Sequence, residues 1–211
     1  MSIIEKEYEE IIRVFKSDKN SFIQRKEQIK NTLITPVNWS SSYLDFYPYS
    51  SIINQLEPAK IYKKEKTPSI KNFYLKDELI FACNNENESW GSLFIDYNKK
   101  NKKSLLFVEN NDEEMVLQEL KVAYFKDNIY EKVLSYVNSE DDDEESLTID
   151  LFEYDSNDNI QKIVRYGFFE EKINILPIRE FDFSYNNNGV KIFANDEKHK
   201  NLLIYEGKTL G

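Results

Sequence analysis

The chain is poor in the residues that most often carry chemistry. Among its 211 residues there is one cysteine, Cys83, and one histidine, His199. A single cysteine cannot form an intramolecular disulfide, so a disulfide-stapled secreted fold is excluded. One cysteine and one histidine also cannot supply the ligands of a typical zinc site. The sequence therefore predicts no cofactor and no metal centre.

Long apolar runs are absent as well. No stretch approaches the roughly 20 apolar residues that a membrane-spanning helix requires. The first residues, Met1 to Glu7, are charged from the start and lack the apolar core of a signal peptide. These features predict a cytoplasmic protein without membrane contacts.

Catalytic motifs are missing too. The chain has five glycines and contains no glycine-rich phosphate loop, no G-x-S-x-G and no dinucleotide fingerprint. The run from Asp155 to Asn159 matches the opening of a calcium-binding loop. However, Ile160 and Tyr166 stand where such a loop needs its glycine and its bidentate glutamate. No calcium site is predicted.

The two residues that could serve a catalytic centre have simpler interpretations. Cys83 ends the apolar run Leu79–Cys83, where a buried cysteine behaves as a small hydrophobe. His199 lies between Lys198 and Lys200 in a polar stretch typical of an exposed turn, and a general base needs geometric partners as well as a suitable pKa. The sequence predicts no catalytic residue, and the protein is not expected to be an enzyme.

Positive charge is missing from the middle of the chain. The 29 residues between Lys132 and Lys162 contain no Lys or Arg, and ten of them are acidic. Residues 1–76 carry 13 basic and 9 acidic side chains, whereas residues 77–211 carry 15 and 29. Like charges at this density repel, so the segment must stay solvated or meet a positive partner. The acidity argues against direct nucleic-acid binding. The alternative to a positive partner is that the negative charge supports solubility.

Hydrophobic periodicity predicts the N-terminal third. Ile4, Tyr8, Ile11, Ile12 and Phe15 form one helical stripe, and a second helix is expected before Pro36, so residues 1–36 are predicted to form a helical hairpin. Residues 37–72 are predicted to be an irregular connection with a short helix from Ser50 to Leu56. The aromatic residues of this connection could belong to the core or to an exposed interaction patch: Trp39, Tyr43, Tyr47 and Tyr49.

Residues 73–211 are predicted to form an antiparallel sheet that carries one long helix over residues 112–137. Period-two patterns and turn-forming runs predict strands at 77–83, 90–97, 104–109, 147–152, 160–169, 180–185, 190–194 and 202–205. Because short turns join most of these strands, the sheet should be antiparallel and the fold class α+β, in one compact domain overall.

A small, acidic protein of this kind, without catalytic signatures, resembles the immunity proteins of bacterial polymorphic toxin systems. The net charge of −10 and the acidic region over residues 139–158 carry the resemblance. It implies a basic protein partner, a toxin domain such as a nuclease, which the protein would neutralise by covering its active site or substrate groove. The partner-binding residues would be the acids of this region: Asp141, Asp142, Asp143, Glu144, Glu145, Asp150, Glu153, Asp155 and Asp158.

Two alternatives remain open from the sequence. The first is an anti-restriction or anti-defence inhibitor that mimics nucleic acid and so uses the same acidic surface. The second is an oligomeric scaffold that assembles, for example as a homodimer, through the N-terminal helices. Within the acidic region, we expect the tract Glu140–Glu145 to steer association and the hairpin acids Asp150–Asp158 to provide specificity.

Overall fold

The computed structural model describes residues 3–32, 35–127, 129–139, 144–169, 172–173, 177–186 and 189–209. Two helices open the chain, α1 (Ile3–Asp18) and α2 (Phe22–Asn31), and a single helical turn, α3 (Ser50–Ile53), follows later. A 3-10 turn, η1, spans Glu88–Trp90. No described helix is long and apolar enough to cross a membrane.

The remaining elements are strands of one antiparallel sheet. They are β1 (Thr35–Ser40), β2 (Ile61–Tyr62), β3 (Ile70–Leu75), β4 (Glu78–Asn84), β5 (Ser92–Tyr97), β6 (Asn101–Glu109), β7 (Met115–Lys126), β8 (Ile129–Ser139), β9 (Glu144–Tyr154), β10 (Ile160–Phe169), β11 (Lys172–Ile173), β12 (Arg179–Asn186), β13 (Gly189–Asn195) and β14 (Leu202–Gly207). Their order is β14-β13-β12-β10-β9-β8-β7-β6-β5-β4-β3-β1-β2, and β11 pairs with β10. Most neighbours in the sheet are therefore also neighbours in the chain.

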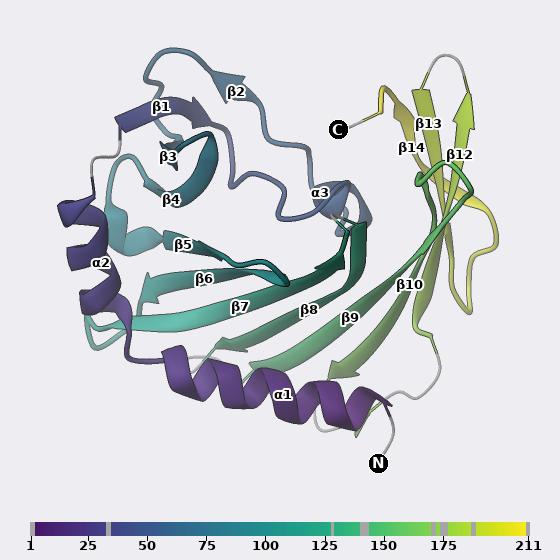
Figure 1. Cartoon of the computed structure of the whole chain (residues 1–211), viewed down its shortest axis with the longest axis horizontal. Helices are drawn as coiled ribbons and strands as arrows, with labels where there is room; N and C mark the ends of the chain where they lie inside the picture. The colour runs from purple at the N-terminus through teal and green to yellow at the C-terminus, as the bar shows by residue number, and fades with distance from the viewer. Residues whose placement is uncertain are drawn as a thin grey trace.

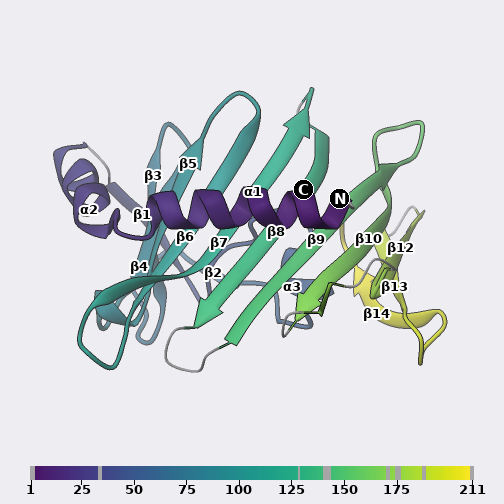
Figure 2. The same cartoon turned by 90° about the horizontal axis from the view of Figure 1, so that it is seen from below.

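The sheet curves into a trough (Figure 1). Strands β1 to β4 form one wall, β12 to β14 form the other, and β5 to β10 form the floor. Helix α1 lies across the outer side of the floor, as the view from below shows (Figure 2). The segment that carries α3 lies inside the trough (Figure 1). Both faces of the floor are thus covered, one by helices and the other by an irregular segment.

The core consists of layers on the two faces. On the outer face, Ile11 and Phe15 of α1 pack against Leu120, Leu134 and other side chains of β4 to β9. On the inner face, the α3 segment packs against side chains of β7, β8, β10, β12 and β13. A smaller inner cluster joins β3, β4 and β5. Because successive residues of a strand point to opposite faces, each floor strand contributes apolar side chains to both layers.

The helix predicted over residues 112–137 is wrong: residues 115–126 form β7 and residues 129–139 form β8. Residues of β7 face alternately outward (Leu120, Val122) and inward (Lys121, Ala123). Since both faces of these strands are buried in part, apolar residues occur at odd and even positions, and this spacing imitates a helical stripe. Asp127, which follows the last residue of β7, adopts a φ of 53°.

Two predictions for the N-terminal third are partly confirmed. The helices α1 and α2 exist, but α2 turns along the outer side of the sheet and does not fold back on α1 as a hairpin (Figure 1). Residues 37–72 are not one irregular connection, because they contain most of β1, all of β2 and the start of β3. The short helix was expected over Ser50–Leu56 and covers Ser50–Ile53. The mainly antiparallel α+β class is confirmed.

Candidate functional site: the concave face

The inside of the trough is crossed by residues 41–57, which we name the bridge segment. Its fold depends on Asp45, whose carboxylate accepts hydrogen bonds from the Ser51 amide at 2.9 Å and from the hydroxyls of Ser50 and Ser51 at 3.0 and 3.1 Å. The backbone N–H groups at the start of a helix have no partner within it. Asp45 supplies an acceptor for one of them, the Ser51 amide. Asp45 therefore fixes α3 inside the trough.

A buried ionic network attaches the bridge segment to the floor. Asp150 of β9 is 1% exposed and pairs with Arg165 of β10 through two bonds, Nε–Oδ1 at 2.7 Å and Nη2–Oδ2 at 2.8 Å. The Tyr47 hydroxyl donates to Asp150 Oδ2 at 2.5 Å, and Arg165 Nη1 donates to Asn54 Oδ1 at 2.8 Å. Two floor residues thus hold both ends of the α3 region.

The pKa values in this network follow from its burial. Desolvation alone would lower the pKa of Arg165, but the hydrogen bonds and charge of Asp150 outweigh it, so the pKa is raised. Desolvation, reinforced by the charge of Asp150, raises the pKa of Tyr47 well above its ordinary value. The network is therefore an ion pair with a neutral phenol at neutral pH. It is suited to holding structure and offers no proton-transfer group.

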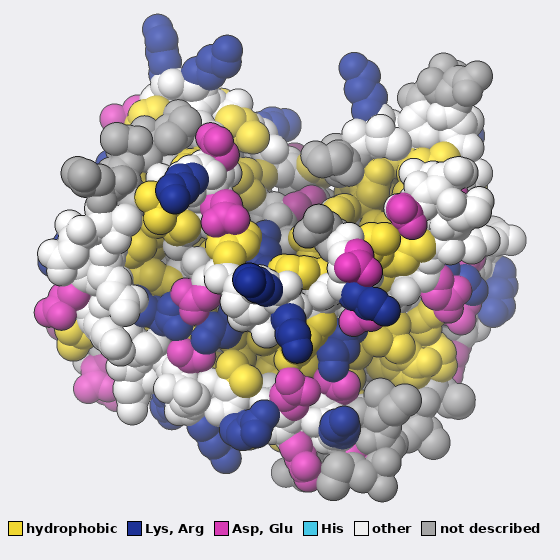
Figure 3. All heavy atoms as spheres, in the orientation of Figure 1, with side chains coloured by type: hydrophobic (Ala, Val, Ile, Leu, Met, Phe, Trp, Pro, Cys, Tyr) yellow, Lys and Arg dark blue, Asp and Glu magenta, His cyan; other side chains and the backbone are white. Residues whose placement is uncertain are grey.

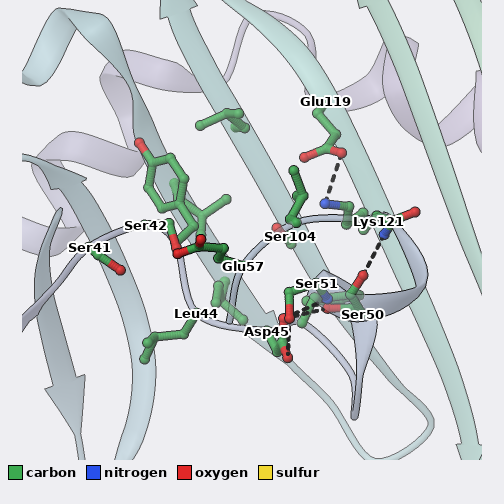
Figure 4. Close-up of a pocket in the computed structure, with 17 residues that line it drawn as sticks. Ser41, Ser42, Leu44, Asp45, Ser50, Ser51, Glu57, Ser104, Glu119 and Lys121 are labelled. Atoms are coloured by element: carbon green, nitrogen blue, oxygen red, sulfur yellow. Dashed lines mark hydrogen bonds and ion pairs between the residues drawn. The ribbon is translucent and has the colours of Figure 1, made fainter. Parts of the chain in front are cut away.

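One hollow of the concave face is a cavity of about 540 Å³ between the bridge segment and strands β5 to β7, named here the bridge pocket. Leu44, Leu56, Leu93, Ile95 and Leu106 give it apolar walls, and serines and Tyr43 add hydroxyl groups. Figure 4 shows Glu119 and Lys121 side by side on its floor, where Lys121 Nζ lies 2.8 Å from Glu119 Oε1. Asp45 and Glu57 bring two further carboxylates from the bridge segment.

A second hollow lies beside Pro48 and Tyr49, where the β7–β8 and β9–β10 turns meet. Two cavities of about 450 and 410 Å³ share Ile129, Tyr130 and Tyr154 in their lining. Phe152 and Tyr185 extend the aromatic surface, and the Phe152 and Tyr154 rings stack with centroids 6.5 Å apart. We name this hollow the tyrosine groove. Its acidic lining residues are Asp127, Glu131 and Asp158.

Charge on the concave face is unbalanced. The described lining of the bridge pocket and the tyrosine groove holds six carboxylates (Asp45, Glu57, Glu119, Asp127, Glu131 and Asp158) but only two lysines, Lys121 and Lys126. One of these lysines, Lys121, is already paired with Glu119. Figure 3, in the orientation of Figure 1, shows apolar side chains between the two walls, with charged groups among them. An apolar surface with surplus carboxylates suits a cationic ligand.

The structure separates the acids that the sequence predicted as one partner-binding surface. Asp141, Asp142 and Asp143 lie outside the described residues, and of Glu144 only the backbone, at the start of β9, is described. Glu153 is exposed, on the side of β9 opposite to Phe152 and Tyr154. Asp158 is exposed and lines the tyrosine groove, and Asp155 lies in the same turn. One of the nine predicted residues, Asp158, thus lines a described hollow.

Two of the acids that were predicted to bind a partner make contacts within the protein instead. Asp150 is buried beneath the bridge segment and neutralised by Arg165, so it presents no charge to a partner. Glu145 is half-buried on the outer face and accepts hydrogen bonds from the hydroxyls of Tyr8 and Tyr136, both at 2.8 Å. Glu144 and Glu145 of the acidic tract are the first two residues of β9.

Asp155 has a local structural role. Its carboxylate accepts bonds from the backbone amides of Asn157 and Asn159 at 2.8 and 3.0 Å and from the Asn159 side chain at 3.0 Å. The Asn159 side chain contributes most to lowering the pKa of Asp155, and the two backbone bonds add to it. The carboxylate shapes the β9–β10 turn and thereby positions Asp158 next to the groove.

Sequence reasoning missed Asp45, Glu57, Glu119, Asp127 and Glu131. For Glu119 the sequence did contain a signal: Glu119 and Lys121 lie on one side of β7, and this strand is otherwise largely apolar. That signal could be used only if residues 115–126 were recognised as a strand. The other four residues face the hollows because the bridge segment, the β7–β8 turn and the start of β8 bring them there, and no local pattern specifies such contacts.

Cys83 and His199 lie away from both hollows. Cys83 is buried in β4, and desolvation, with the charge of Glu88 as a smaller cause, raises its pKa to about 11. Such a thiol is protonated and unreactive at neutral pH. The His199 ring is exposed in the β13–β14 turn, with Nδ1 3.1 Å from Asp196 Oδ1. Neither residue has the neighbours of a nucleophile or a general base, and no group of acids, His and Cys in the described residues could hold a metal ion.

The concave face also contains a poorly solvated lysine. Lys102 Nζ donates to the Phe46 carbonyl oxygen at 3.0 Å and lies 4.7 and 5.5 Å from the ring centroids of Phe46 and Tyr97. Desolvation lowers its pKa to about 8, and the charge of Glu78 opposes the shift only in part. Lys102 connects the bridge segment to β6, but removing its positive charge from water in this position costs free energy.

This placement predicts how stability depends on pH. Between pH 8 and 10.5 the unfolded chain holds the Lys102 proton while the folded protein releases it, so Lys102 should add about 2–3 kcal/mol to the free energy of unfolding across this interval. Buried tyrosines with a raised pKa, such as Tyr154, act in the opposite direction as the pH approaches 10, so the rise is measured as the difference between the wild type and Lys102→Met in urea unfolding. Because methionine has no proton to release, the free energy of unfolding of the wild type should rise relative to that of this variant. An unchanged pH slope in the variant would contradict the assignment.

Comparison with known proteins gives no relative: no family model, no curated protein and no solved structure matches the chain.

Proposed function

We propose that the protein binds a basic protein partner on its concave face. The observation that supports this is the lining of the bridge pocket and the tyrosine groove, with six carboxylates against two lysines. Apolar and aromatic walls carry these charges, and buried aromatic anchors with charged surroundings are the usual composition of a tight interface. The described lining of both hollows contains no histidine and no cysteine.

Charge and apolar surface would contribute differently to binding. The net charge of −10 attracts a basic partner over a distance and raises the association rate. Tyr130, Phe152 and Tyr154 then offer ring faces on which Arg and Lys side chains gain cation–π contacts. Such short-range contacts slow dissociation. The same surface would reject an acidic partner through repulsion.

The resemblance to immunity proteins implies what kind of protein the basic partner would be. A toxin domain that acts on nucleic acid must present a basic surface to its substrate. An acidic trough that covers this surface would block the substrate and so neutralise the toxin. In this form the concave face takes the place of the substrate phosphates, and the partner is the cognate toxin.

The proposal predicts a specific loss of binding. Affinity capture from the source cells identifies the partner, and the rate constants are then measured with purified proteins at several salt concentrations. The double variant Asp127→Asn/Asp158→Asn removes two groove charges, and asparagine tolerates the left-handed φ values of 53° and 61° at these positions. We expect the association rate constant to fall about tenfold at low salt, with a weaker salt dependence.

The control removes the same charge elsewhere. Glu153 lies on the outer side of β9 and Glu197 in the β13–β14 turn, and both are exposed. Glu153→Gln/Glu197→Gln should therefore change association much less than the groove variant. Equal effects of the two double variants would show that net charge alone attracts the partner. A partner that is not basic would contradict the proposal outright.

A further inference from the structure

The two edges of the sheet differ in how they are protected. An edge strand exposes unpaired backbone N–H and C=O groups and can pair with another chain, so soluble proteins shorten or charge such edges. At one end of the order, β2 has two residues and is flanked by Lys60, Lys63 and Lys64. At the other end, β14 runs for six residues from Leu202 to Gly207. Its length makes it the open edge.

The outer edge of β14 has no partner strand among the described residues, since β13 pairs with its inner edge only. Leu202 and Leu203 are 47% and 46% exposed, whereas Ile204 and Tyr205 pack against the inner core. The chain that follows does not run along this edge, because Thr209 lines the tyrosine groove on the concave face. Two leucines therefore lie exposed on an extended strand with free hydrogen-bonding groups.

The local charge around β14 indicates which kind of chain could pair with this edge. Residues 189–208 carry four lysines (Lys191, Lys198, Lys200 and Lys208) and three acids (Asp196, Glu197 and Glu206), within a chain whose net charge is −10. A basic partner would find no surplus of carboxylates here. Two copies of the protein, which must repel each other elsewhere, could approach at this nearly neutral edge.

We propose that two copies of this chain associate through β14, paired antiparallel about a two-fold axis, so that their sheets form one continuous sheet. Antiparallel pairing of identical strands satisfies the free backbone groups of both edges and gives a closed, isologous interface. With the two-fold axis at Leu203, Leu203 of one copy would lie opposite Leu203 of the other, and Leu202 opposite Ile204. This inference does not depend on the proposed function, since the concave faces stay open.

Sedimentation equilibrium of the full-length protein tests the proposal from about 1 µM to about 1 mM, a range that covers weak to moderate association. The wild-type mass should rise with concentration from the monomer value of 25.1 kDa to twice that value. Leu203→Lys should keep the protein monomeric, because it places like charges side by side at the two-fold axis. Leu202→Lys, at the neighbouring exposed position, should act in the same direction.

The matched control uses the other edge. Ile61 of β2 is 60% exposed, so Ile61→Lys makes the same chemical change without touching β14, and this variant should dimerise like the wild type. Circular dichroism shows whether each variant is folded. A wild-type protein that stays monomeric over the whole range would overturn the proposal. So would folded β14 variants that dimerise normally, or a loss of dimers in Ile61→Lys.

Discussion

Asp150→Asn is expected to lower the free energy of unfolding by about 3–5 kcal/mol, because it leaves the Arg165 guanidinium buried without its counter-ion. Arg165 is 8% exposed, so water cannot replace the lost carboxylate charge. The Tyr47 hydroxyl loses its charged acceptor in the same substitution. The effect is large because one change breaks the buried ion pair and also weakens the contact of the bridge segment through Tyr47. Urea unfolding, followed by tryptophan fluorescence and circular dichroism, measures it.

A neighbour on the same strand provides the control. Glu153→Gln makes the same type of change at an exposed position three residues away and should alter stability by less than about 0.5 kcal/mol. Replacing both partners, Asp150→Leu with Arg165→Met, should recover much of the loss, since a buried pair costs desolvation energy that apolar side chains avoid. If Asp150→Asn were as mild as Glu153→Gln, the ion pair would not hold the bridge segment.

Phe107→Ala is expected to cost about 3–5 kcal/mol through the cavity that it leaves. Phe107 has no exposed surface and lies between the helices and the floor of the sheet. Its ring contacts Phe22 of α2 and Phe94 of β5, with centroids 5.5 and 5.8 Å away. The substitution therefore weakens the attachment of α2 to the outer face. Thermal and urea unfolding of the variant give the magnitude.

Trp90→Ala is the matched comparison, because Trp90 is a large apolar residue that is 62% exposed. Its removal should cost less than about 1 kcal/mol, since little buried surface is lost. Similar costs for the two variants would mean that the aromatic cluster between α2 and the sheet contributes little to stability. A large cost for Phe107 alone would identify this outer layer as the main core of the protein.

The buried network explains why the acidic region of the sequence was misleading. Ten acids in 29 residues suggested one binding surface. Strand alternation sends Asp150 inward and Glu153 outward, and the register of β9 with β10 places Asp150 directly opposite Arg165. The side-chain direction could be expected from the sequence, but the partner of Asp150 could not. Whether a carboxylate attracts a partner or stabilises the core therefore depends on pairing between strands.

The sequence by itself determined the elements whose signals are local. Ile4, Ile11 and Phe15 specify the buried stripe of α1, and most hairpin strands follow from alternation and turn-forming residues. The tertiary structure decided the rest. Residues 115–126 and 129–139 form strands of a sheet that is covered on both faces, which places apolar side chains at both parities and removes the period that distinguishes a strand from a helix. The concave face exists because the sheet curves and the bridge segment crosses it, and this arrangement depends on contacts between residues more than 100 positions apart, such as Tyr47 with Asp150.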